Sequence, residues 1–284
     1  MLASKVLRAV FLWPLVSLSS TYGQNLTQQQ AINRNRTLSI GYVIFDGFEP
    51  LDVWGPMEWL TSLSAFYPMN LSTISYHAGP VSARFASHLG TSYDQTINPS
   101  MLATHNFTFA PPLDIIIVPG GTGVINATLS NLTTIESFLT SRYDATDYIL
   151  GVSFGVTHLA RSGLLKGKKA TTNKSGWAWI TGFGQDVKWV PQARWVVDGK
   201  VWTSSGMASS LDMVYAWLGE VYGNAGGVNL MTDVIEYAPH LNPDWDPYAV
   251  YHQVPGADAS RPVLDCVGPV GMTGNGSVSA RKKI

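Results

Sequence analysis

Residues 148–166 read YILGVSFGVTHLARSGLLK, and this stretch decides the fold. Its apolar start predicts a buried strand, and an amphipathic helix is predicted from Phe154 onward. Gly151 and Gly155 bracket the turn between the two elements. Ser153 is therefore expected in a strained, exposed conformation at the end of the strand, where nucleophiles are commonly mounted. The stretch predicts a strand-turn-helix elbow with Ser153 as a candidate functional residue.

Strands and helices alternate along the rest of the chain. Apolar, β-branched runs predict strands over 37–45, 69–77, 113–118, 148–152 and 169–172, and helical patterns cover 53–64, 133–143, 154–165, 207–222 and 228–237. Asp198-Gly199 predicts a hairpin between 193–197 and 200–204. This alternation predicts an α/β fold, a flavodoxin-like three-layer sandwich whose mostly parallel sheet has helices on both faces.

The predicted domain covers residues 38–238. It follows an N-terminal segment (24–37) and precedes a Pro/Gly-rich extension (239–284) that is expected to be irregular. Residues 1–23 have the form of a secretory signal peptide, with a basic start, an apolar stretch and a small-residue cleavage site. No later run reaches about 20 apolar residues, so no stable membrane span is expected. The chain is predicted to enter the secretory pathway and to be secreted or held in a vesicular or vacuolar lumen.

Seven N-x-S/T sequons are glycosylation candidates: Asn25, Asn35, Asn70, Asn106, Asn126, Asn131 and Asn275. Asn173 lies in an eighth sequon, and for it a ligand contact and a glycosylated surface position are both open. Cys266 is the one cysteine of the chain, so no intrachain disulfide can form and the core must be self-sufficient. Its place in the Gly/Pro-rich extension argues against a catalytic role.

Composition excludes several function classes. Charged residues make up 13% of the 284 residues, about half the usual share, and the net charge of −1 gives no support for nucleic-acid binding. The histidines lack metal-ligand spacing, so no metal is expected. Gly120-Gly121-Thr122-Gly123 lacks the Lys-Ser/Thr of a phosphate-binding loop, which argues against a nucleotide. No cofactor is predicted, and the expected partner is a small-molecule substrate.

Five segments in order resemble the ThiJ/PfpI family of the class I glutamine-amidotransferase-like superfamily. They are GFEPLDVWGP at 47–56, VPGG at 118–121, the elbow, residues 163–177, and the strands and turns over 188–206. Within the family the chain is most similar to isonitrile-hydratase-like members. The resemblance implies that Asp52 points at the elbow residue, that the Gly120 and Gly121 amides face the reacting centre, and that the protein forms a homodimer.

Three residues depart from the family pattern. Ser153 replaces the family's cysteine, Phe154 replaces a small polar residue or histidine, and Asn173 replaces a histidine found in many relatives. A serine hydroxyl is far less acidic than a thiol and needs an adjacent base. No histidine adjoins the elbow, and His158 is expected deep along the helix. The departures therefore argue against the family's cysteine-based activities.

Asp52 is the stronger catalytic candidate. It is flanked by Leu51, Val53 and Trp54, and burial there would raise its pKa toward the range useful for proton transfer. The alternative is that Asp52 caps the helix expected from Val53. Ser153 and the amides of Gly120 and Gly121 would polarise a substrate oxygen. Phe154, Asn173 and Trp177 are expected to contact substrate, although core packing is an equal alternative for Trp177.

Three functions are compatible with these residues. The favoured one is an enzyme without a cysteine intermediate that catalyses hydration, elimination, isomerisation or cyclisation of a small molecule, as in natural-product biosynthesis. The second is a serine hydrolase, because residues 151–155 satisfy G-x-S-x-G and Asp233, Asp244 or Asp246 precedes His252. The third is a non-catalytic small-molecule-binding protein that has lost the family's chemistry.

Overall fold

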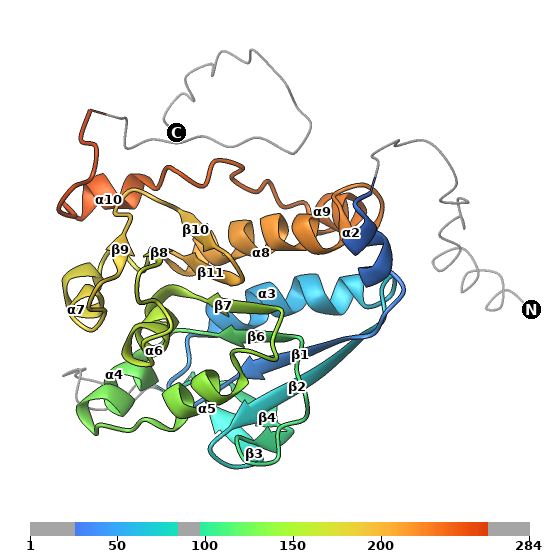
Figure 1. The fold of residues 1–284 in the computed structure, drawn as a ribbon, viewed down its shortest axis with the longest axis horizontal. Coiled ribbons are helices and arrows are strands. Elements are labelled where there is room, and N and C mark those ends of the chain that lie inside the picture. The colour runs from blue at the N-terminus through green and yellow to red at the C-terminus, as the bar shows by residue number, and fades with distance from the viewer. Residues whose placement is uncertain (1–25, 85–96, 261–284) are drawn as a thin grey trace, which may run out of the picture.

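A computed structural model describes residues 26–84 and 97–260 (Figure 1). Its centre is a seven-stranded sheet in the order β10-β11-β7-β6-β1-β2-β5. The strands are β1 (Leu38–Val43), β2 (Met69–Ser75), β5 (His105–Asn106), β6 (Ile115–Val118), β7 (Tyr148–Gly151), β10 (Trp195–Asp198) and β11 (Val201–Ser204). Within this sheet β10 runs antiparallel to β11, and every other pair is parallel.

The parallel order β2-β1-β6-β7-β11 is that of a flavodoxin-like fold, which confirms the predicted class. Two small sheets flank it. One pairs β3 (Gly79–Ser82) with β4 (Ser100–Ala103), and the other pairs β8 (Lys169–Ala170) with β9 (Lys188–Trp189). The hairpin predicted at Asp198-Gly199 is confirmed as the β10-β11 connection, with Asp198 opposite Val201.

Helices cover both faces of the sheet. They are α2 (Gln28–Asn33), α3 (Pro50–Leu63), α4 (Thr122–Leu129), α5 (Thr134–Arg142), α6 (Val156–Arg161), α7 (Trp177–Thr181), α8 (Met207–Tyr222), α9 (Gly227–Ile235) and α10 (Pro247–Tyr251). Figure 1 shows α3, α8 and α9 together on one side and α4, α5 and α6 on the other. All four residues of β6 are fully buried as a result, which explains its uninterrupted apolar sequence. No helix in the described ranges is long and apolar enough to cross a membrane.

Several element boundaries differ from the sequence prediction. α3 begins at Pro50 rather than Val53, because proline's fixed φ suits the first helical position. The elbow helix is shorter than predicted: a 3₁₀ turn over Ser153–Gly155 precedes α6, which ends at Arg161. The sequence analysis also missed α4 and α2, although a capping box at Thr27 and Gln30 marks the start of α2.

The described part of the C-terminal extension, residues 239–260, packs on the domain. The prediction of irregular structure fits much of it, but α10 is helical. The Arg194 amide donates to Pro243 O (2.7 Å), and the Asp246 amide donates to Gln192 O (2.6 Å). These bonds fasten the extension to the chain before β10. The signal peptide, Asn25, Cys266 and Asn275 lie outside the described residues.

Candidate active site

Asp52, Gly120 and Ser153 converge at the carboxyl edge of the sheet. Asp52 lies in the first turn of the helix after β1, Gly120 follows β6, and Ser153 follows β7. These three strands are neighbours, so the turns after them meet. The order of strands reverses between β1 and β6, and ligands of open α/β sheets bind at this kind of switch point.

Ser153 has the strained backbone predicted for an elbow, with φ of +53°. Gly155 permits the turn, because a Cβ there would lie 2.3 Å from Val118 O. The expected exposure is wrong, since Ser153 is only 2% exposed. The loop after β8 contacts it at two atoms: Thr172 Oγ1 donates to Ser153 O (2.9 Å), and Asn173 Nδ2 donates to Ser153 Oγ (3.1 Å).

Asn173 is fixed in one orientation by its own loop. Its Oδ1 accepts hydrogen bonds from the Ser175 amide (2.9 Å), Ser175 Oγ (2.6 Å) and the Gly176 amide (3.2 Å). Because three donors contact the same atom of the Asn173 amide, that atom is the oxygen and the other is Nδ2. Nδ2 therefore faces Ser153, in a buried position that has no room for a glycan in the folded protein.

Asp52 is a fully buried carboxyl with one oxygen in use. Its Oδ2 accepts the Gly120 amide (2.8 Å), whereas Oδ1 has no hydrogen-bond partner in the described residues. Burial raises the pKa of Asp52 to about 8; the Gly120 bond opposes the shift and the nearby charge of Glu49 adds to it. With this pKa the side chain is mostly protonated at pH 7, and the Gly120 bond to Oδ2 leaves Oδ1 as the oxygen that can carry the proton. Asp52 does not cap α3, because the N-cap residue is Glu49.

Gly120 separates the Asp52 carboxyl from the elbow. A Cβ on Gly120 would lie 2.7 Å from Asp52 Oδ2 and 2.8 Å from the Phe154 amide nitrogen. The absence of a side chain thus lets the acid and the elbow approach each other. The Gly120 amide, expected to face a substrate oxygen, instead binds Asp52. Gly121 has a structural role. Its φ is +131°, and a Cβ there would lie 2.2 Å from Gly47 O, so a glycine is needed where the turn after β6 packs against the turn after β1.

The aromatic candidates lie in different environments. The half-buried Phe154 ring is 6.1 Å from the Trp179 ring, and a Cβ on Gly176 would lie 2.4 Å from its edge. Phe154 therefore borders the elbow. Trp177 instead packs against Trp189, at 5.9 Å between ring centroids, and joins an apolar cluster with Ala249 and Val254 of the extension. The packing alternative describes Trp177 better than substrate contact does.

Neither His158 nor His252 forms a hydrolase triad with Ser153. His158 is fully buried and its Nδ1 lies 3.0 Å from Glu136 Oε1. His252 is exposed and contacts the rings of two tyrosines of α10. Asp246 accepts a hydrogen bond from Ser205 rather than from His252. The described residues also contain no group of three or more side chains suited to a metal ion.

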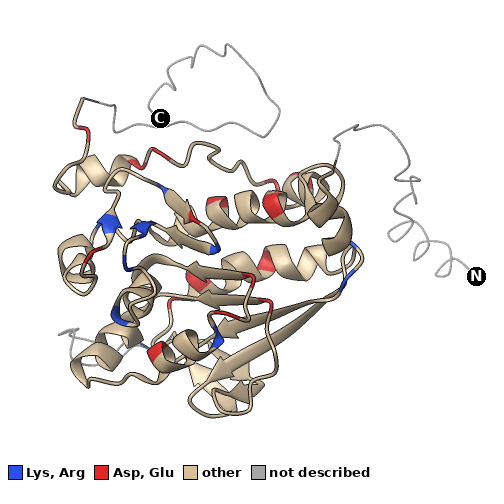
Figure 2. Cartoon of the chain, in the orientation of Figure 1, with Lys and Arg blue, Asp and Glu red and all other residues tan. Residues whose placement is uncertain are grey.

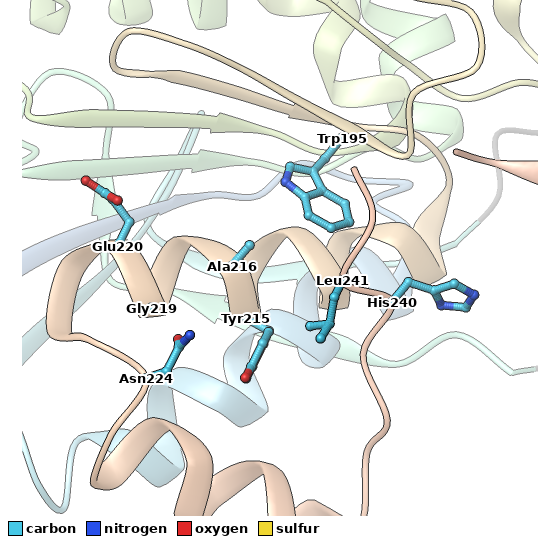
Figure 3. Close-up of a pocket in the computed structure, with 8 residues that line it drawn as sticks. All are labelled: Trp195, Tyr215, Ala216, Gly219, Glu220, Asn224, His240 and Leu241. Carbon is cyan, nitrogen blue, oxygen red and sulfur yellow. The ribbon is translucent and has the colours of Figure 1, made fainter. Parts of the chain in front are cut away.

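A separate cavity of about 340 Å³ lies between α8 and the segment after α9 (Figure 3). It is lined by Trp195, Tyr215, Ala216, Gly219, Glu220, Asn224, His240 and Leu241. In Figure 3 the side chains of Glu220 and His240 point away from Trp195, and the lining combines polar and apolar side chains. None of these residues belongs to the site at the carboxyl edge of the sheet.

Sequence reasoning missed two residues beside the elbow, Thr172 and Lys174. Thr172 had been predicted only as the end of a strand, yet its hydroxyl holds the Ser153 carbonyl. Lys174 is 4% exposed, an exception for a residue type that is almost always at the surface. No periodicity marks either of them, since both lie in an irregular loop whose contacts are distant in sequence.

The class of protein follows from these observations: a flavodoxin-like α/β domain with a buried acid and a strained serine at its switch point. Residues 39–220 match the DJ-1/PfpI family, and the chain belongs to this family. Isonitrile hydratase from Pseudomonas putida is 29% identical over 222 residues, which cover 75% of this chain and 86% of the relative.

Solved structures agree on the fold. A THiJ/PfpI family protein from Pseudomonas syringae has a TM-score of 0.60 and 22% identity, covering 78% of this chain and 85% of its own. Drosophila melanogaster DJ-1beta has a TM-score of 0.57 and 18% identity, covering 72% of this chain and 100% of its own. At these identities the likeness concerns the fold alone.

Proposed function

We propose that the protein is an acid–base enzyme that acts on a small organic molecule without a cysteine intermediate. The observation that carries the proposal is Asp52, a buried carboxyl whose pKa is raised to about 8 by desolvation and whose Oδ1 has no protein partner among the described residues. Such a group holds a proton at neutral pH and can give it to a bound substrate.

Hydration is the reaction that fits this acid best. Adding water across an unsaturated group requires one proton to be given to the substrate and one to be removed from water. Asp52 gives the proton from Oδ1 in the first step and, as a carboxylate, takes one from water in the second. The acid is therefore restored at the end of each turnover. The isonitrile hydratase relative supports this reaction class, and elimination, isomerisation and ring closure use the same proton shuttle.

Ser153 acts as a hydrogen-bond donor in this mechanism. Its Oγ accepts the Asn173 amide, and this bond leaves the Ser153 O–H available as a donor to a substrate. His158, the histidine nearest to it in sequence, does not serve as its base, because His158 Nδ1 pairs with Glu136. The hydroxyl therefore orients the substrate or polarises it, while Asp52 moves the proton.

The test is turnover of a panel of small isonitriles and other unsaturated compounds, with products measured by mass spectrometry. Wild-type activity that disappears in Asp52→Asn and persists in the exposed control Asp144→Asn supports the proposal. Unchanged activity in Asp52→Asn contradicts it. Labelling of Ser153 by a fluorophosphonate would instead indicate a serine hydrolase, and ligand binding without turnover would indicate a binding protein.

The cellular setting is a second part of the proposal. The signal-like N-terminus and the sequons support entry into the secretory pathway, where the enzyme would serve the synthesis of a small natural product. Asn35, Asn70 and Asn131 are exposed and accessible to glycosylation. Asn106 and Asn126 are half-buried. A homodimer is also proposed, and sedimentation of the purified protein would test it.

A further inference from the structure

The loop from Thr171 to Ser175 holds Ser153 and is itself held by a buried lysine. Thr172 and Asn173 bind the carbonyl and the hydroxyl of Ser153, as described above. The side chain of Lys174 contacts other parts of the chain than Ser153. Its Nζ donates to Thr171 Oγ1 (2.6 Å), Thr172 O (3.3 Å) and Ala193 O (2.8 Å). One ammonium thus fastens the loop to the chain before β10.

The three oxygens around Nζ match the charged form of the lysine. Three acceptors surround it, and an ammonium has three N–H donors whereas a neutral amine has two. The Trp177 ring adds a further contact suited to a cation, with Nζ 4.9 Å from the ring centroid. Loss of one proton from Lys174 would therefore release one of the three bonds that hold the loop.

The charges that face Lys174 come from the extension and from the chain before β10. Burial lowers the pKa of Lys174 to about 7, the charge of Asp246 opposes this, and Arg194 adds to it. Arg194 is itself paired with Asp212 of α8, with Nε 2.5 Å from Oδ2, and its Nη1 lies 3.9 Å from Asp246 Oδ1. Figure 2 shows that charged residues are sparse in the described part of the chain.

We propose that Lys174 is a positioning residue for Ser153, and that the C-terminal extension supports it through Asp246, whose Oδ1 lies 3.9 Å from Nη1 of Arg194, the residue that follows the Ala193 carbonyl bound by Nζ. The inference rests on the proposed role of Ser153 as a polar anchor. It assigns a function to the extension: residues 239–260 pack on Trp177 and on the chain before β10, and through them support the loop that orients the Asn173 amide against the serine hydroxyl. Above neutral pH the loop is expected to loosen as Lys174 loses its proton.

The test uses a thiol in place of the serine hydroxyl, so that it does not depend on turnover. In Ser153→Cys, the Asn173 amide stabilises the thiolate, and the thiol pKa is read from thiolate absorbance against pH. The wild-type chain, which has only Cys266, gives the baseline. Adding Lys174→Met is expected to raise the Ser153→Cys thiol pKa by about one unit. Without Lys174 the Asn173 amide is no longer held against the thiolate, and this charge-assisted hydrogen bond is lost. The exposed control Lys188→Met is expected to leave it unchanged.

Two further variants complete the test. In an Asn173→Ala background, Lys174→Met should have no additional effect, because the bond it positions is already gone. Asp246→Asn keeps Lys174 and should raise the same thiol pKa, as Lys174→Met does. If the Lys174→Met protein does not fold, Asp246→Asn tests the proposal in its place. A thiol pKa that stays unchanged in the folded Lys174 and Asp246 variants would overturn the proposal, even if their melting temperatures fall.

Discussion

Replacing Asp52 with asparagine should stabilise the protein at neutral pH while removing its activity. The carboxyl has a pKa of about 8 in the folded chain and an ordinary value of 3.8 when exposed. Ionisation therefore favours the unfolded chain, and native stability falls as the pH rises from about 4 to about 8. At pH 7 the penalty is about 4 kcal/mol, from about 1.4 kcal/mol for each of roughly three pH units.

Asparagine removes this penalty but adds a small cost. Its side-chain oxygen can keep the Gly120 hydrogen bond, whereas its NH₂ group takes the position of Oδ1, which has no partner in the described structure. An unpaired buried donor costs about 1–3 kcal/mol. The expected net gain in the free energy of unfolding is therefore about 1–3 kcal/mol at pH 7.

Denaturant unfolding followed by tryptophan fluorescence at pH 5, 6, 7 and 8 measures this difference. The stability gap between Asp52→Asn and wild type should widen by about 1.4 kcal/mol per pH unit and level off above pH 8. Asp144→Asn, an exposed matched control, should show no such trend. A gap that is the same at every pH would refute the reasoning, because the carboxyl would then be ionised in both states.

Three further predictions concern the site and the cellular setting. Ser153→Ala should lower kcat about 10–100-fold in the turnover assay without moving the pH dependence, because it removes a polarising hydrogen bond and leaves the acid in place. Gly120→Ala should abolish turnover, since its Cβ would lie 2.7 Å from Asp52 Oδ2. Gly163→Ala is the control for general loss of stability, because it strains the backbone (φ of +79°) but its Cβ would meet no atom within 4 Å. Glycopeptide mapping of protein from a secretory host should find glycans at Asn70 and Asn131 and none at Asn173, which is buried.

Much of the fold can be read from the sequence because buried parallel strands leave a strong pattern. The isoleucines of β6 and the glycines around Ser153 predict a central strand and a strained elbow, and the structure confirms both. The acid at position 52 could be singled out because apolar neighbours predict burial. These inferences all use contacts within a few residues of each other.

The rest of the site depends on contacts between distant segments. The Ser153 hydroxyl accepts a hydrogen bond from Asn173, 20 residues away, and the Gly120 amide binds Asp52, 68 residues away. Lys174 in turn binds the carbonyl of Ala193, 19 residues away. Composition correctly marks the extension as rich in proline and glycine, but it does not show that the segment packs on the domain.

The protonation state of Asp52 tests the central claim most directly. Carbon-13 NMR of the aspartate side-chain carboxyls against pH measures it, with the Asp52 signal assigned as the one absent from Asp52→Asn. The account predicts a carboxyl that is protonated at pH 7 and titrates near pH 8. Titration of that signal near pH 4, as for an exposed aspartate, would contradict it.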